Sequence, residues 1–197
     1  MKIIHRSYPA GNPIPVEQYI KNRKLRKYFN RETCAAIATV GEFLRTVAID
    51  PEGTPLYYAT GLIEHEDYGL SRIVEKSLDH GHFSDRRFVE DGISCISPLD
   101  QFKVLLNMPL SFISIEFGFK TDNAVIYSSV SGLLSVASML GKERPVIIGA
   151  GKTHSDGSSE AGFALATGDE LREVEIGDPD EEAVNLFRRL AGTGERA

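Results

Sequence analysis

The sequence has few of the features that mark secreted, membrane or nucleic-acid-binding proteins. Its 197 residues include only two cysteines, and no apolar run approaches the roughly 20 residues of a membrane helix. The N-terminal stretch MKIIHRSYPAGNP lacks the long apolar core of a signal peptide. The formal net charge is −6, so the chain has no general attraction for polyanions. We therefore expect a cytoplasmic protein that binds neither nucleic acid nor membranes.

Metal and thiol chemistry also have little support. Cys34 lies in an alanine-rich helical run and Cys95 lies in DGISCISP, far along the chain, so buried free thiols explain both better than a disulfide, a metal site or a nucleophile. His80 and His82 in DHGHFSD, with His65 upstream, lack the accompanying carboxylates or thiols of a metal site. We expect a surface loop there, no bound metal and no other cofactor.

The order of predicted elements favours one α/β domain. A hydrophobic fraction of 42% and a charged fraction of 25% are ordinary for a globular chain of this length. Strands and helices alternate before a terminal hairpin, which is typical of layers packed on a mixed sheet. The patterns predict strands at 2–7, 55–61, 123–128, 144–151, 160–169 and 171–178, and helices at 32–48, 65–79, 130–140 and 180–191, with one or two more within 97–118.

Two familiar catalytic motifs fail on inspection. The Gly-Lys-Thr in IIGAGKTHSDG needs an earlier glycine where Val146 stands, so a phosphate-binding P-loop is disfavoured. In NAVIYSSVSGLLSVASMLG the centre of a G-x-S-x-G elbow, counted back from Gly132, falls on Val130 and not on a serine. Ser128 or Ser129 instead suits the N-cap of the helix that follows.

One polar loop stays open between two interpretations. His154 and Asp156 follow a buried strand in a stretch rich in glycine and serine, where active-site residues often lie. Loops are also polar simply because they bury nothing, and this second interpretation is the more economical.

Four stretches in order resemble the β-ketoacyl synthases of the thiolase superfamily. YSSVSGLLSVASML is similar to the segment around the family's nucleophile, close to T-A-C-A-S-G-L-L-A-L, and the cysteine position falls on Ser129. KNRKLRKYFNRETCAAIATVGEFL resembles the family's basic segment and first long helix. SPLDQFKVLLNMPLSFISIEFGFKTDNAV resembles the segment built around Leu-Pro-Asn-Met, with Leu106 in place of proline. RPVIIGAG and SSEAGFALATGDE resemble the strands that close the N-terminal half.

The resemblance implies a fold and a domain assignment. It implies an α/β, thiolase-like half-domain, a layered mixed β-sheet flanked by helices, with the helices that begin at Glu32 and Val130 on one side of the sheet. Residues 1–197 would form a single β-ketoacyl synthase-like N-terminal domain, and the C-terminal half, which carries the two catalytic histidines, would be absent.

The resemblance also implies a place in acyl metabolism of the fatty acid or polyketide type. Condensation needs a nucleophile that exchanges thioesters and histidines that stabilise the enolate and oxyanion, and serine replaces the cysteine here. We therefore expect a noncatalytic partner or accessory subunit of a condensing enzyme. Two alternatives remain: a serine-dependent acyltransferase or thioesterase with Ser129 as nucleophile and His154 as base, and a non-enzymatic binding or scaffold protein.

Partners follow from the same resemblance and from charge. Relatives pair the strand equivalent to NAVIYS across a two-fold axis, so we expect a homodimer, or a heterodimer with a ketosynthase-like chain. The basic segment would face an acidic acyl carrier protein through Lys21, Arg23, Lys24, Arg26 and Lys27.

Overall fold

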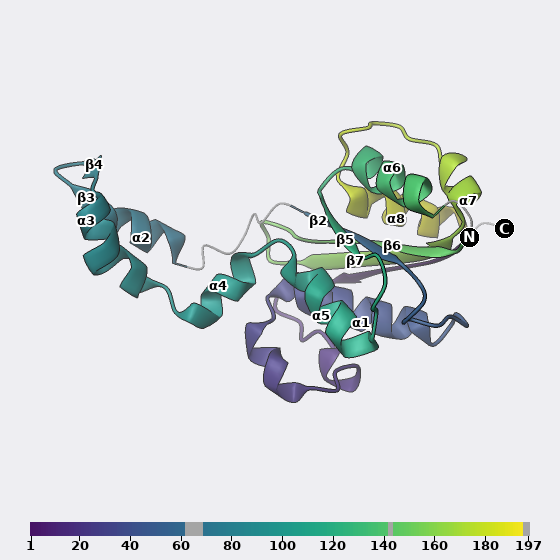
Figure 1. The fold of residues 1–197 in the computed structure, drawn as a ribbon, viewed down its shortest axis with the longest axis horizontal. Coiled ribbons are helices and arrows are strands. Elements are labelled where there is room, and N and C mark those ends of the chain that lie inside the picture. Colours follow the sequence, from purple (N-terminus) through teal and green to yellow (C-terminus); the bar gives the residue numbers. More distant parts are fainter. Residues whose placement is uncertain (62–68, 142–143, 195–197) are drawn as a thin grey trace.

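A five-stranded mixed sheet forms the centre of the computed structural model, which describes residues 1–61, 69–141 and 144–194 (Figure 1). The strand order is β1-β7-β6-β2-β5. β2, β5 and β6 are mutually parallel, whereas β7 is antiparallel to both of its neighbours. The strands are β1 (Lys2–Tyr8), β2 (Leu56–Thr60), β5 (Ala124–Tyr127), β6 (Val146–Thr153) and β7 (Ser159–Ala166), with a separate hairpin of β3 (Leu78–Asp79) and β4 (His82–Phe83).

Helices cover both faces of the sheet, and no described helix has the length and apolar character needed to cross a membrane. The α-helices are α1 (Arg31–Leu44), α2 (Leu70–Ser77), α3 (Asp85–Arg87), α4 (Pro98–Val104), α5 (Met108–Phe117), α6 (Val130–Leu140), α7 (Gly168–Arg172) and α8 (Ala183–Gly194). Short 3-10 helices are η1 (Val16–Gln18), η2 (Arg23–Tyr28) and η4 (Ile93–Cys95), and η3 (Phe88–Gly92) is a π-helical turn.

The helices at 32–48 and 130–140 lie on opposite faces, which corrects the prediction that they share one. Figure 1 shows α1 and α5 on one side of the sheet and α6 and α8 on the other. Side chains alternate along a strand, so Tyr58 packs in the core under α1 and α5, whereas Tyr57 packs in the core under α6 and α8. α1 connects β1 to β2, and α6 returns in the opposite direction from β5 to β6. Right-handed crossovers in opposite directions place their helices on opposite faces.

Most predicted elements are confirmed with small shifts. α6 has the predicted bounds, and the apolar run VIIGAGKT is buried at all eight positions of β6. α1 ends at Leu44, four residues before the expected end. The predicted 65–79 helix is α2, which starts at Leu70, and residues 65–68 lie outside the described residues. His80 and His82 are exposed in the β3–β4 hairpin, as expected of a surface loop.

The predicted strand at 171–178 is wrong, because the chain turns into α7 after β7. Thr167 caps the helix by accepting from the backbone N–H of Glu170, and the Glu170 carboxylate accepts from the backbone N–H of Thr167 at 2.8 Å. This reciprocal capping box satisfies two N–H groups at the helix start, which have no partner within the helix. The hairpin in this region is β6–β7, one connection earlier, with Ala150 opposite Gly162.

A glycine allows α8 to pack directly on the sheet. Phe187 is fully buried, and a Cβ added at Gly162 would lie 2.2 Å from the Phe187 Cβ, which is attached rigidly to the helix. A methyl group there would push α8 away from β7.

We expect Gly162→Ala to lower the free energy of unfolding by about 1–3 kcal/mol through overpacking. Gly192→Ala is the matched control, since nothing lies within 4 Å of its added Cβ and alanine favours a helix over glycine by up to about 1 kcal/mol. Urea unfolding of both variants measures the difference. Equal stability of the two would contradict the close approach of α8.

Candidate functional site

Ser129 lies at the junction between β5 and α6, as the sequence predicts. Ser128 has a left-handed φ of 58°, which turns the chain out of the strand. Ser129 is the N-cap, and its Oγ accepts a hydrogen bond from the backbone N–H of Gly132 at 3.1 Å. This confirms the cap and gives the Ser129 hydroxyl oxygen a structural role.

The N–H groups at the start of α6 all have partners in the chain itself. Val130 N donates to the Glu181 carbonyl at 2.8 Å, and Ser131 N donates to the Pro179 carbonyl at 3.3 Å. The next two N–H groups, those of Gly132 and Leu133, bond to the side chain and the carbonyl of Ser129. An oxyanion hole needs N–H groups that are free to bind a developing charge, and this helix start offers none in the structure.

The segment before α8 is held against this junction. Ala183 N donates to the Ser128 carbonyl at 2.6 Å, and Ser129 and Glu182 form an isolated antiparallel bridge. Glu182 pairs with Lys152, whose side chain is buried at the end of β6. Glu182 Oε1 is itself buried and finds no hydrogen-bond partner among the described residues. The Lys152–Glu182 ion pair therefore lies inside the protein and helps to close the junction.

A second buried carboxyl lies on the other face, at the end of β2. Glu32 on α1 accepts from Tyr58 Oη at 3.0 Å and from Thr60 Oγ1 at 2.9 Å. Burial and, to a smaller degree, the negative charge of Glu182 raise the pKa of Glu32 to about 8 despite these two donors. Glu32 therefore holds a proton at neutral pH.

His154 contacts a third carboxyl and not Ser129. Its Nε2 lies 2.6 Å from Glu160 Oε1, and His5 Nε2 lies 2.8 Å from Glu160 Oε2. Arg188 on α8 pairs with the same carboxylate. Burial alone would raise the pKa of Glu160, but hydrogen bonds from His5, Arg188 and His154 lower it to about 2. Glu160 thus stays ionised and ties the β6–β7 loop to β1 and α8.

The predicted nucleophile and base are not joined in the structure. β2 lies between β5 and β6, so the strand before His154 is not adjacent to the strand before Ser129. Among the described residues, no basic side chain forms a hydrogen bond with Ser129. The assignment of Ser129 and His154 as catalytic stays a prediction. No group of three or more His, Cys, Asp or Glu in the described part of the chain could hold a metal ion.

The sequence analysis missed the carboxyls at the ends of the strands. Glu32 is the first residue of the predicted helix at 32–48, and Glu160 is the first residue of the predicted strand at 160–169, where a charged side chain is common. Lys152 could have been singled out from the sequence. It directly follows the apolar run VIIGAG, and a lysine in a buried strand needs a charged or polar partner.

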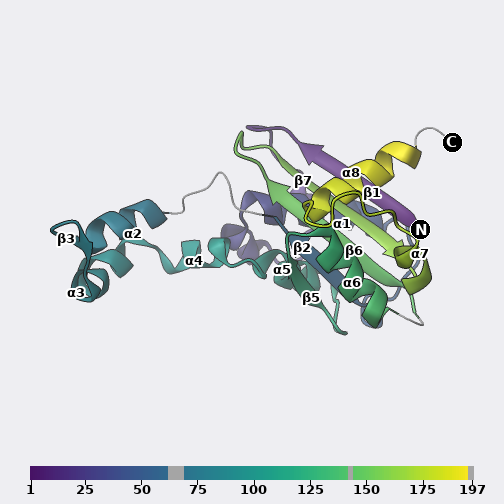
Figure 2. The ribbon, with the colours of Figure 1, turned by 90° about the horizontal axis from the view of Figure 1, so that it is seen from above.

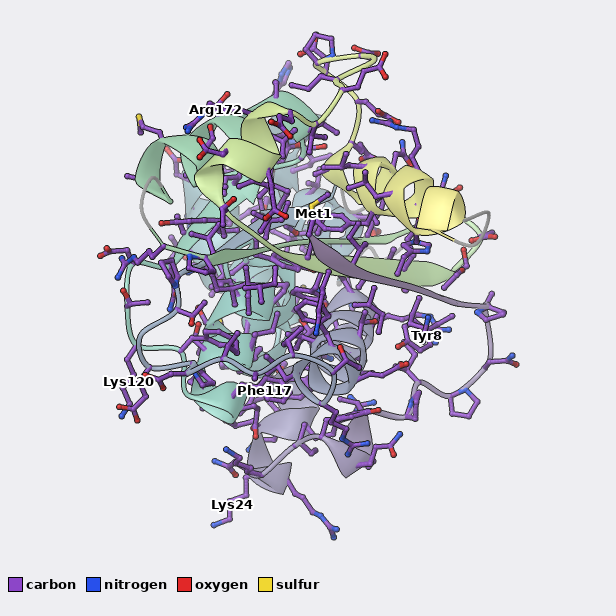
Figure 3. The ribbon with its side chains drawn as sticks, turned by 90° about the vertical axis from the view of Figure 1, so that its right-hand side faces the viewer. Met1, Tyr8, Lys24, Phe117, Lys120 and Arg172 are labelled. Carbon is purple, nitrogen blue, oxygen red and sulfur yellow. The ribbon has the colours of Figure 1, made fainter. Side chains whose placement is uncertain are left out.

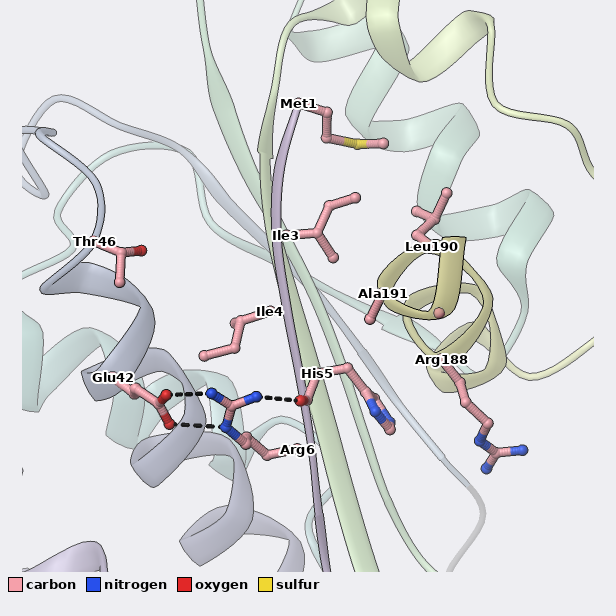
Figure 4. Close-up of a pocket in the computed structure, with 11 residues that line it drawn as sticks. Met1, Ile3, Ile4, His5, Arg6, Glu42, Thr46, Arg188, Leu190 and Ala191 are labelled. Atoms are coloured by element: carbon pink, nitrogen blue, oxygen red, sulfur yellow. Dashed lines mark hydrogen bonds and ion pairs between the residues drawn. The ribbon is translucent and has the colours of Figure 1, made fainter. Parts of the chain in front are cut away.

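A pocket of about 700 Å³ lies at the opposite edge of the sheet, along β1 between α1 and α8 (Figure 4). Arg6 crosses it to pair with Glu42 and donates from Nη1 to the carbonyl of His5 at 3.0 Å. Its lining includes Arg188 but neither Ser129 nor any residue of β5 or α6. The pocket is therefore separate from the Ser129 junction.

The predicted basic cations lie in η2 (Arg23–Tyr28) and in the two residues before it. Lys21, Arg23, Lys24 and Lys27 are exposed, and Figure 3 shows Lys24 extending away from the body. Arg26 is half-buried and lies 3.3 Å from Glu17. Four of the five predicted cations are thus open to a partner.

Comparison with known proteins shows the fold. No known protein family and no curated protein matches the sequence. A solved structure described as "AntDE:AntF (apo): type II PKS acyl-carrier protein in complex with its ketosynthase bound to the hexaketide" matches with a TM-score of 0.50 and 13% identity. The match covers 83% of this chain and 55% of that one. The chain has a thiolase-like, ketosynthase-type fold.

A second solved structure, "The ishigamide ketosynthase/chain length factor", matches with a TM-score of 0.40 and 16% identity over 86% of this chain and 44% of that one. The chain thus spans about half the length of the ketosynthase-type chains that it matches. The predicted α/β fold class, a layered mixed sheet flanked by helices, is confirmed.

The pH dependence of the free energy of unfolding should show whether Glu32 is protonated in the folded chain. Its pKa is about 8 in the folded chain, against about 4.5 for a glutamate exposed to water, so folding takes up a proton at pH values between these two. The free energy of unfolding therefore falls as the pH rises from about 4.5 to 8. Glu32→Gln removes the ionisation, so we expect its urea unfolding free energy to change less between pH 5 and 8.5, by a few kcal/mol. Glu75→Gln on exposed α2 is the control. A wild-type profile as flat as that of Glu32→Gln would contradict a protonated Glu32.

Proposed function

We propose that the chain is a noncatalytic ketosynthase-like subunit that supports a condensing enzyme of fatty acid or polyketide type. The observation that carries the proposal is the closed start of α6. The resemblance assigns the nucleophile to Ser129, yet its Oγ caps the helix and the neighbouring N–H groups bond to residues 179 and 181. A serine hydroxyl needs a positioned base to attack a thioester, and no described base hydrogen-bonds Ser129.

The domain assignment supports the same role. We propose that residues 1–197 correspond to the N-terminal half of a ketosynthase, in line with a match that covers 55% of the ketosynthase-type chain. The solved ketosynthase complex is described as bound to an acyl-carrier protein. By analogy, the exposed cations of the 21–27 segment would hold an acidic acyl carrier protein near a catalytic partner, with affinity that falls as salt rises.

The protein should form no acyl-enzyme. Incubation with acetyl and malonyl thioesters followed by intact-mass analysis should show no adduct, and no malonyl decarboxylation should be detected. Ser129→Ala should change neither result and should cost about 1 kcal/mol of stability through loss of the cap. An adduct that disappears in Ser129→Ala and persists in the control Ser131→Ala would instead establish the serine acyltransferase or thioesterase alternative.

Pairing through β5 should make the protein a dimer. β5 lies at the edge of the sheet, carries no charged residue and exposes 58% of Tyr127. The unpaired backbone groups of such an edge can bind another strand, from a second copy or from a ketosynthase-like chain. Tyr127→Lys tests this better than a change at Ile126, because Ile126 packs on the core under α6.

We expect light scattering at micromolar concentration to give a dimer for wild type and a monomer for Tyr127→Lys, with similar melting temperatures. Ile176→Lys, a change at an exposed position after α7, should stay dimeric. A monomeric wild type that also fails to bind a co-encoded synthase would overturn the pairing.

A further inference from the structure

Another pocket, of about 480 Å³, lies at the start of α1, next to η1 and η2. α6 and α8 lie in front of the sheet in Figure 2, and α1 packs on the opposite face, so this pocket is remote from the Ser129 junction. The apolar part of its lining includes Pro13, Ile14 and Phe29, and its charged part consists of Glu17, Arg26 and Arg31. A pocket of this size and mixed lining accommodates a small organic molecule.

Arg31 brings a positive charge to this pocket that no carboxylate of the described residues neutralises. It is the first residue of α1, and its Nη2 donates to the carbonyl of Pro9 at 2.6 Å and to that of Asn12 at 3.2 Å. These neutral acceptors hold the guanidinium in place but leave its charge without a counterion. The two arginines of the pocket along β1 differ in this respect, because both of them pair with carboxylates.

The Nε–H groups of Arg26 and Arg31 also lack an acceptor. Both Nε atoms are buried, and neither forms a hydrogen bond with any residue that the structure describes. Glu17 Oε1 lies 3.3 Å from Arg26 Nε and forms an ion pair with it, but without the alignment of a hydrogen bond. Buried donors without an acceptor are uncommon in folded proteins and call for a physical explanation. Two such donors in the lining of one pocket indicate an acceptor that the chain itself does not supply.

The charges and the apolar lining limit what this acceptor can be. Two arginines and one glutamate give the lining a net charge of +1, so a single negative charge neutralises it, whereas a dianion would be repelled by Glu17. Guanidinium groups bind carboxylates strongly, and the apolar residues favour an organic body. We propose that this pocket binds a small organic monoanion, a carboxylate on an apolar body, through Arg26 and Arg31. The inference is independent of the carrier docking and of the β5 pairing proposed above.

The arginine side chains themselves can report binding in a titration of the full chain followed by NMR. We expect benzoate to shift the Nε–H resonances of Arg26 and Arg31 until they saturate, whereas benzamide, which has the same shape and no charge, should not shift them. Arg31→Lys should weaken benzoate binding about tenfold or more, because lysine lacks the planar fork of the guanidinium. Lys24→Gln is the matched control, since it removes a positive charge from an exposed position of η2 outside the pocket, and it should weaken binding by no more than about twofold.

Glu17 provides a test with the opposite sign. Its side chain is 61% exposed, so Glu17→Gln should leave the fold intact. The change removes the counterion of Arg26, so benzoate should bind about threefold tighter or more. Inorganic phosphate, which should not bind wild type at this pocket, should then shift the same two resonances. A purely structural role of the two arginines would produce no such gain.

Each outcome bears on the pocket. Resonances that do not respond to benzoate, or that respond equally to benzamide, would overturn the inference. Equal losses of affinity in Lys24→Gln and Arg31→Lys would also overturn it, because benzoate would then collect on the basic surface of η2. If Arg31→Lys lowers the melting temperature through loss of its bonds to the loop before η1, Arg26→Lys and Glu17→Gln take its place. Unchanged benzoate affinity in both of these variants would exclude a site at the two arginines.

Discussion

The backbone of residues 179–183 lies across the first turn of α6, and much of the structure depends on this contact. Hydrogen bonds between Glu181 and Val130, and between Ala183 and Ser128, join two segments some fifty residues apart. They set the start of α8, so that Phe187 reaches the sheet over Gly162. The same contact uses the helix N–H groups that a ketosynthase-type site would require for an oxyanion. One backbone contact thus completes the fold and closes the candidate site.

Two buried carboxyls in this fold take opposite protonation states, and the difference lies in their donors. Glu32 receives hydrogen bonds only from the neutral hydroxyls of Tyr58 and Thr60, which do not offset the cost of burying a charge, so its pKa is about 8. Glu160 receives Arg188 and two histidines, and its pKa is about 2. Through ion pairs with His5, His154 and Arg188, Glu160 therefore joins β1, the β6–β7 loop and α8. Glu32 is instead a neutral hydrogen-bond acceptor in the core under α1.

Local patterns in the sequence predicted the elements well and their contacts poorly. Val130–Leu140 has its cap in Ser129 and its apolar stripe within one segment, so its bounds were predictable. The Thr167–Glu170 capping box is also local, but the sequence analysis predicts a strand over 171–178, the residues that follow it. The contacts that close the Ser129 junction join residues far apart in the sequence. Lys152 with Glu182, and α6 with residues 179–181, depend on the path of the chain across the sheet, which no window of sequence contains.

The two edges of the sheet differ in a way that favours association at only one of them. On β1 the outward carbonyl of His5 is occupied by Arg6, which Glu42 holds in place. Within residues 1–61, 69–141 and 144–194, no side chain covers the outer edge of β5 in this way, and the strand presents Tyr127 at this edge. Charge at an edge opposes a further strand, and its absence permits one.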